Sequence, residues 1–246
     1  MAITIKTAAD VEGMRIAGRL ASEVLDMLTP HVKPGVTTQR LDDLAYQFAM
    51  DNGAFPATLF YRGYTKSICT SINHVVCHGI PDDKPLREGD ILNIDYTLIV
   101  DGWHGDSSRM YGVGDISRKA ERLIEITYES LLRGIRAVRA GGTTGDIGFA
   151  IQRYAEAERC SVVRDFCGHG LGRLRGYRDA RTGIGHRVVA GVHRMQHRHA
   201  GHHVVHQLVR RDAEAVDRRA PPADVGDVDA GQQRRHLRLR HGVEQR

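Results

Sequence analysis

The amino-acid composition changes abruptly near residue 175, and this break limits which part of the chain can fold. Residues 175–246 contain 15 Arg, nine His and no Lys, but only one Ile, three Leu and one aromatic residue, Tyr177. Such a segment has too little apolar surface to offset the entropy that is lost on ordering. We therefore expect one folded domain at 1–174 and a disordered Arg/His-rich tail at 175–246, which also accounts for the net charge of +5.

Two pairs of amphipathic helices are predicted within residues 1–174. Apolar residues recur at helical spacing from 7 to 28, from 37 to just before Gly53, from 117 to 139 and from 143 onward. The second pair repeats the first at an offset of 106 residues, because Gly-Val-Thr-Thr at 35–38 aligns with Gly-Gly-Thr-Thr at 141–144. Helix–Gly–Thr–helix joints are common, but the matching apolar positions favour two equivalent halves, each a helix pair followed by strands. The predicted fold class is α+β.

The segment 90–112 predicts a β-hairpin with two aspartates on one face, and another strand is expected at about 58–70. Asp101-Gly102 is a two-residue turn signal, which places Asp95 opposite Ser108 and Asp106 opposite Thr97. The two aspartates would then be diagonal neighbours whose backbones lie roughly 7 Å apart. Both could be ordinary hairpin aspartates, but Asp95 interrupts an apolar strand, where an unpaired carboxylate costs about several kcal/mol. Carboxylates at this separation can converge on metal ions.

Histidines in glycine-flanked contexts accompany this hairpin. A lone histidine between glycines, such as His169, is usually a surface loop residue, but beside the aspartate pair it becomes a third candidate ligand. Carboxylate and imidazole together suit Mn, Fe, Co or Zn. His78 is either a packed loop residue or a group that hydrogen-bonds a peptide in the transition state. His74 and His104 are expected to be surface residues.

Tyr61, Tyr64 and Cys69 lie in a turn-rich stretch before this region and either line an apolar pocket or belong to the core. The four cysteines form no Cys-x-x-Cys pair, and the first residues contain no apolar leader. These features favour reduced thiols in a cytoplasmic protein and predict no membrane segment.

Taken together, the motifs of residues 3–174 resemble those of bacterial type I methionine aminopeptidases, which have the pita-bread fold. The segments that carry the resemblance occur in the family's order and spacing, and they are SINHVVCHGIPDD, GDILNIDYTLIVDGWHGDSSRMY and CGHGLGR. The resemblance implies removal of the N-terminal methionine from nascent chains in the cytoplasm, near the ribosome, by a monomeric enzyme with two divalent ions (Co, Mn, Fe or Zn). No nucleic-acid partner is expected.

The resemblance also implies roles for individual residues. Asp95, Asp106 and His169 would ligate the metal ions, with Asp106 bridging both of them. His78 would be catalytic and would contact the substrate peptide. Tyr61, Tyr64 and Cys69 would border the methionine pocket. Asn73 and Val75 would bind a monovalent cation.

The tail departs from this family. Arg175-Gly176 stands where the family has Phe-His, and two further glutamate ligands have no match in the chain. A change of reading frame at or just after Leu174 in a GC-rich gene would produce such an Arg-, His- and Ala-rich sequence. We therefore expect an incomplete second half and poor binding of both ions. The alternative is a metal-free relative that binds protein or nucleic acid, with the arginines contacting phosphates.

Overall fold

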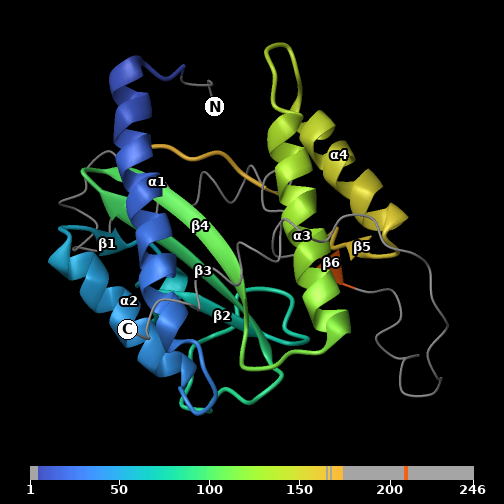
Figure 1. Cartoon of the computed structure of the whole chain (residues 1–246). Helices are drawn as coiled ribbons and strands as arrows, with labels where there is room; N and C mark the ends of the chain where they lie inside the picture. Colours follow the sequence, from blue (N-terminus) through green and yellow to red (C-terminus); the bar gives the residue numbers. More distant parts are fainter. Residues whose placement is uncertain (1–4, 165, 167, 174–207, 210–246) are drawn as a thin grey trace, which may run out of the picture. The chain divides into compact units, whose positions relative to one another are not determined.

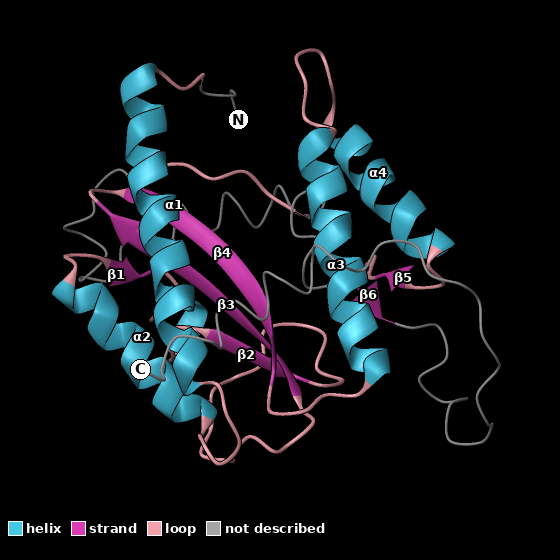
Figure 2. Cartoon of the chain, in the orientation of Figure 1, coloured by secondary structure: helices cyan, strands magenta, loops and turns pink. Residues whose placement is uncertain are grey.

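The computed structural model describes residues 5–164, 166, 168–173 and 208–209, all within Met1–Arg211, the first of two compact units. Figures 1 and 2 show a mixed α and β structure, which confirms the predicted α+β class. The helices are α1 (Ala8–Leu28), η1 (Thr29–His31), α2 (Thr38–Asp51), η2 (Tyr61–Gly63), α3 (Arg118–Arg136) and α4 (Thr144–Ala157). The strands are β1 (Phe55–Pro56), β2 (Cys69–Ile72), β3 (Ile91–Val100), β4 (Trp103–Gly112), β5 (Ser161–Val162) and β6 (Leu208–Val209).

The predicted helix starts are confirmed because a hydroxyl side chain caps each long helix. In α1 the Thr7 side chain accepts a hydrogen bond from the Asp10 backbone, and the Asp10 carboxylate accepts one from the Thr7 backbone. Thr143 and Asp146 form the same capping box at α4. Each such cap contributes about 1 kcal/mol to stability. The capping side chains of α2 and α3 are Thr37 and Ser117.

Strand β3 is the centre of the main sheet. It pairs antiparallel with β4 on one edge and with β1 and β2 on the other. The turn at Asp101-Gly102 has positive φ at both residues, 49° and 82°, as a tight hairpin turn requires. The predicted register is confirmed, since Asp95 pairs with Ser108 and Thr97 with Asp106.

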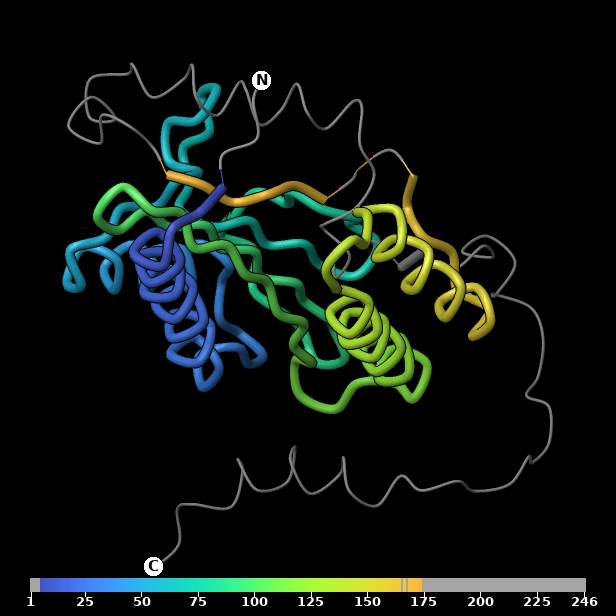
Figure 3. Tube along the Cα trace, turned by 90° about the horizontal axis from the view of Figure 1, so that it is seen from above, coloured from blue at the N-terminus to red at the C-terminus, as the bar shows by residue number. Residues whose placement is uncertain are grey.

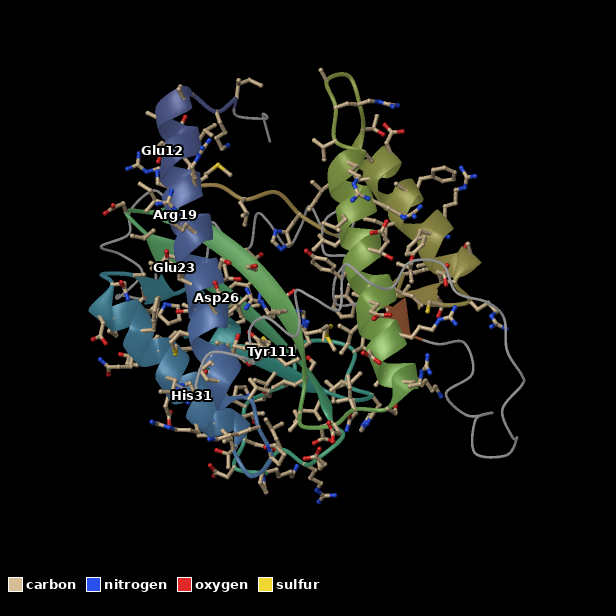
Figure 4. All side chains as sticks on the ribbon, viewed as in Figure 1. Glu12, Arg19, Glu23, Asp26, His31 and Tyr111 are labelled. Carbon is tan, nitrogen blue, oxygen red and sulfur yellow. The ribbon has the colours of Figure 1, made fainter. Side chains whose placement is uncertain are left out.

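Helix α1 covers one face of this sheet. Figure 3 shows α1 running alongside the strands, and alternate β3 side chains meet its buried face. The Tyr111 hydroxyl donates to the Leu25 carbonyl at 2.7 Å, and Arg109 forms a 2.8 Å ion pair with Asp26. In Figure 4, Asp26 lies along α1 and Tyr111 beside its C-terminal part. The β3 residues in this core are Leu92, Ile94, Tyr96 and Leu98, all fully buried.

Helices α3 and α4 form a second pair with a smaller core of its own. Ile126, Ala155 and Cys160 are its buried residues, and the Arg133 guanidinium lies 4.0 Å from the centre of the Tyr154 ring. Large apolar side chains remain exposed on and just after α3. They are Tyr128, Ile135 and Val138, each more than half exposed.

One strand prediction was wrong. The stretch 58–70 is mostly turn and 3-10 helix, and only its last two residues belong to β2, because Phe60 and Arg62 adopt left-handed backbone angles. After the second helix pair, the short strand β5 at Ser161–Val162 pairs with β6, in agreement with the expectation that strands follow each helix pair. Asp165 and Cys167 lie outside the described residues.

Candidate metal centre

The face of the hairpin opposite α1 carries the polar residues. Successive strand residues point to opposite faces, so Asp95 and Thr97 face away from the α1 core. The Thr97 hydroxyl donates to Asp106 Oδ1 at 3.0 Å across the β3–β4 pair. This hydrogen bond orients the Asp106 carboxylate, whose side chain is only 8% exposed.

His169 meets Asp106 from the far end of the described chain. Its Nε2 lies 3.5 Å from Asp106 Oδ2, and its Nδ1 lies 3.2 Å from the Gly170 carbonyl. A carbonyl oxygen only accepts, so Nδ1 carries the proton in this contact and Nε2 is the nitrogen that faces the carboxylate. Two residues 63 positions apart are thereby brought together.

The donors present suit a transition-metal ion. Two ligands of a tetrahedral ion with bonds of about 2.1 Å lie roughly 3.4 Å apart, close to the spacing of Asp106 and His169. Among the described residues, however, no group of three His, Cys, Asp or Glu side chains is close enough to hold an ion. The structure therefore brings Asp106 and His169 together, whereas Asp95 is a diagonal neighbour of Asp106 on the same face and is not grouped with the pair.

Asp95 lies beside the predicted methionine pocket. It pairs with Cys69 across β2 and β3. Burial raises the pKa of the Cys69 thiol to about 12, with the Asp95 charge adding to the effect. Burial also raises the pKa of the Tyr64 hydroxyl, which donates to the Ile68 carbonyl at 2.8 Å. Tyr64, Cys69 and Asp95 are therefore neighbours, as a pocket beside the metal would require.

His78 has a left-handed backbone conformation. It is exposed, has a φ of 55°, and its ring meets that of Phe166 edge-on with centroids 5.4 Å apart. The next residue packs tightly on β2, where Thr70 donates to the Gly79 carbonyl at 2.8 Å. Strained backbone that is held by its surroundings is frequent at functional sites.

The two positions expected to bind a monovalent cation have different environments. The Asn73 side-chain oxygen accepts a hydrogen bond from the Ile91 backbone at 3.0 Å, and its amide nitrogen donates to Asp90 at 2.8 Å. Val75 is exposed, and its backbone N–H donates to Ile72. Asn73 therefore also has a structural role in closing the turn before β3. Tyr61, in η2, has a buried hydroxyl group.

Two residues near the centre were not predicted as site residues. The Asn93 side chain is 4% exposed, and neither of its amide atoms has a hydrogen-bond partner among the described residues. It shares the face of Asp95, and its alternation with Asp95 and Thr97 along an apolar strand was the available signal. His104, expected on the surface, instead lies against Gly172, and burial lowers the pKa of its imidazole. The expectation was wrong for His104, whereas His74 is exposed as predicted.

Comparisons with known proteins agree with this geometry. The family model of metallopeptidase family M24 matches residues 12–207. Over 174 residues the chain is 59% identical to the methionine aminopeptidase of Rickettsia prowazekii, and over 175 residues it is 55% identical to that of Salmonella typhimurium. These alignments cover 71% and 70% of this chain and 67% and 66% of the relatives. The chain thus spans about two thirds of their length.

Solved structures give the same picture. The crystal structure of the Rickettsia prowazekii methionine aminopeptidase matches with a TM-score of 0.69 over 70% of each chain. The methionine aminopeptidase of Thermotoga maritima, 32% identical, matches with a TM-score of 0.68, again over 70% of each chain. A Xaa-Pro dipeptidase from Bacillus anthracis, 21% identical, shares the fold with a TM-score of 0.60 over 70% of this chain and 48% of its own.

No α-helix in the described part of the chain combines the length and apolar character that crossing a membrane requires.

Proposed function

Because the chain belongs to metallopeptidase family M24, we propose that its site removes the N-terminal methionine from polypeptides by metal-dependent hydrolysis. The observation that carries this proposal is the approach of His169 to Asp106, 3.5 Å apart, on the face that also bears Asp95. The relatives named methionine aminopeptidase, at up to 59% identity, support the same activity.

The proposed metal ligands are Asp95, Asp106 and His169. A bound divalent ion supplies a polarising charge for the scissile carbonyl and lowers the pKa of a bound water. The chain's own contribution is to fix the ligands: Thr97 holds the Asp106 carboxylate, and the Gly170 carbonyl fixes the ring nitrogen that His169 presents. We propose two ions, of Co, Mn, Fe or Zn, since carboxylate and imidazole donors suit all four metals.

The substrate peptide is proposed to lie between the hairpin face and the turn-rich stretch before β2. Tyr61, Tyr64 and Cys69 would border the methionine side chain, and burial keeps the Tyr64 hydroxyl and the Cys69 thiol neutral. His78 would hydrogen-bond the peptide group, which its exposure permits. Asn73 and the Val75 carbonyl would bind a monovalent cation.

The biological setting is proposed from the same resemblance. Its substrates would be nascent polypeptides near the ribosome, in the cytoplasm, with the enzyme acting as a monomer. The rival function, a metal-free binding module for protein or nucleic acid, is not favoured, because the relatives are aminopeptidases and the chain retains the Asp106–His169 pair.

The domain limits remain a proposal: a catalytic domain at 1–174, with an incomplete second half, and a tail at 175–246 that is disordered or read out of frame. The Rickettsia prowazekii alignment covers 174 residues, the length of the proposed catalytic domain. The family match extends to residue 207, and β6 (Leu208–Val209), which pairs with β5, also lies beyond the proposed boundary. The exposed apolar side chains of the α3 region also support it. Sequencing the gene across codons 165–185 tests the reading frame.

The proposed activity predicts slow, ion-dependent release of methionine by the full chain from a Met-Ala-Ser peptide in Co²⁺ or Mn²⁺. With ligands missing, we expect a rate at least about 100-fold below that of the Rickettsia prowazekii enzyme, since changes in supporting residues alone cost about 10–100-fold. N-acetylated peptide and excess EDTA serve as controls, and neither reaction should release methionine. Release that persists in EDTA or from the acetylated peptide would overturn the proposal.

A further inference from the structure

We propose that His104 is a positioning residue that clamps the 170–173 segment onto β4 and so places His169 beside Asp106. The inference rests on the proposed metal-binding role of His169. The hydrogen bonds of His104 go to the Gly172 carbonyl, and the Asp106 carboxylate is also close enough to act on the His104 imidazole by its charge.

Both donors of His104 converge on one carbonyl oxygen. The ring Nδ1 lies 3.0 Å from the Gly172 oxygen, and the His104 backbone N–H donates to the same atom at 3.2 Å. Because a carbonyl can only accept, the ring must carry its proton on Nδ1. One side chain and one backbone group therefore hold the same point of the segment.

The neighbouring residues continue this attachment. Trp103 and Arg173 form an antiparallel bridge, and the Arg173 guanidinium lies 5.4 Å from the centre of the Trp103 ring. The 170–173 segment thus runs along the start of β4 as a short additional pairing partner. The cation–π contact of Arg173 with Trp103 therefore adds to the two His104 hydrogen bonds in holding the segment.

The spacing links this clamp to the candidate ligand. His104 and Asp106 lie two positions apart on β4 and therefore share a face, about 7 Å apart along the strand. His169 precedes Gly172 by three residues, which span at most about 10–11 Å. Fixing the Gly172 carbonyl at His104 therefore limits His169 to the neighbourhood of Asp106.

The start of β4, which carries His104, is packed closely on α1. A Cβ atom at Gly105 would lie 2.0 Å from the Ala17 carbonyl oxygen, and one at Gly13 would lie 2.3 Å from Trp103 Nε1. Helix α1 and the start of β4 are thus in direct backbone contact. His104 thus projects from a strand that is packed closely on α1, and its contacts with Gly172 fix the segment relative to that strand.

The simpler reading is that His104 only fills space. His104→Ala removes the ring N–H that donates to the Gly172 carbonyl. His104→Asn keeps an N–H at nearly the same distance from Cβ and should therefore restore this hydrogen bond. His74→Ala is the matched control, since His74 is an exposed histidine outside β4. All variants are made in the full-length chain and are compared by two measurements.

The first measurement is limited trypsin cleavage without added metal, with fragments identified by mass. We expect His104→Ala to speed cleavage after Arg173 about fivefold, the factor for one lost hydrogen bond. The rate of cleavage after Arg40 in α2 should stay unchanged in His104→Ala. In His74→Ala and His104→Asn, the rates of cleavage after Arg173 and after Arg40 should both match those of the unmodified chain. An equal acceleration at Arg173 and Arg40 would indicate general destabilisation and would overturn the proposal, as would no acceleration at Arg173.

The second measurement is Co²⁺ affinity by calorimetric titration. His104→Ala should weaken binding about fivefold or more, with His104→Asn and His74→Ala near the unmodified chain. Faster cleavage after Arg173 with unchanged Co²⁺ affinity would overturn the link from His104 to His169. If the unmodified chain binds no Co²⁺, the proposed metal site fails by itself, and the clamp is then decided by the cleavage pattern.

Discussion

Replacing Asp106 with asparagine is expected to weaken Co²⁺ binding by the chain at least about 100-fold. Residues that merely support metal ligands contribute about 10–100-fold to affinity, so loss of a charged ligand should exceed that range. Asp106 is the carboxylate that Thr97 orients and His169 approaches at 3.5 Å, which makes it the centre of the candidate site. Asparagine preserves its size and keeps one oxygen that can accept from Thr97.

The matched control for this prediction is Asp101→Asn in the same hairpin. Asp101 is exposed in the turn, with a φ of 49°, and asparagine tolerates this left-handed conformation well. Calorimetric titration should show a loss of Co²⁺ affinity in Asp106→Asn and no loss in Asp101→Asn. Equal affinities, or equal losses, would show that Asp106 is not a ligand.

A second large effect is expected at Gly105, where alanine should lower the free energy of unfolding by about 3 kcal/mol. A Cβ atom there would lie 2.0 Å from the Ala17 carbonyl oxygen and 2.3 Å from the Ala17 carbonyl carbon. Both are backbone atoms of α1, so no side chain can rotate away, and the helix must move off the sheet. The added methyl group thus separates the two surfaces that form the main core.

Gly18→Ala in α1 provides the contrasting substitution. A Cβ atom at Gly18 meets nothing within 4 Å, and alanine in a helix is favoured over glycine by about 0.5–1 kcal/mol. Urea unfolding followed by circular dichroism should therefore show Gly18→Ala more stable and Gly105→Ala much less stable than the unmodified chain. A Gly105→Ala protein of unchanged stability would contradict the close packing of α1 on β4.

The hairpin could be predicted from the sequence because its information is local. Asp101-Gly102 specifies a tight turn, and once the turn is fixed every cross-strand pair follows, including Asp95 with Ser108. The helix starts were equally local, since hydroxyl caps such as Thr7 and Thr143 lie three residues from the groups they bind. These short-range rules placed both carboxylates on one face.

The clamp at His104 could not be predicted in this way. Its partner, Gly172, is 68 residues distant, and nothing in the sequence around His104 distinguishes it from the exposed His74. Glycines near residue 170 indicated only that the backbone could approach another element closely. Which element it approaches depends on how the chain returns to β4, and that is a property of the whole fold.

The stretch before β2 shows a different limit. A strand is expected at about 58–70 because strands should follow the first helix pair, but Phe60 and Arg62 adopt left-handed angles that end regular pairing. Thr58 donates to the Ser67 carbonyl at 2.6 Å and closes this stretch into a loop. Side-chain to backbone bonds of this kind compete with strand pairing, and sequence periodicity does not reveal which will win.

The most direct test is methionine release by a hybrid of residues 1–174 and the remaining third of the Rickettsia prowazekii enzyme, beyond its aligned region. The account predicts release of methionine from a Met-Ala-Ser peptide that requires added Co²⁺ or Mn²⁺ and is abolished by Asp106→Asn. A folded hybrid that releases no methionine with either ion, or one that keeps its activity after Asp106→Asn, would contradict it.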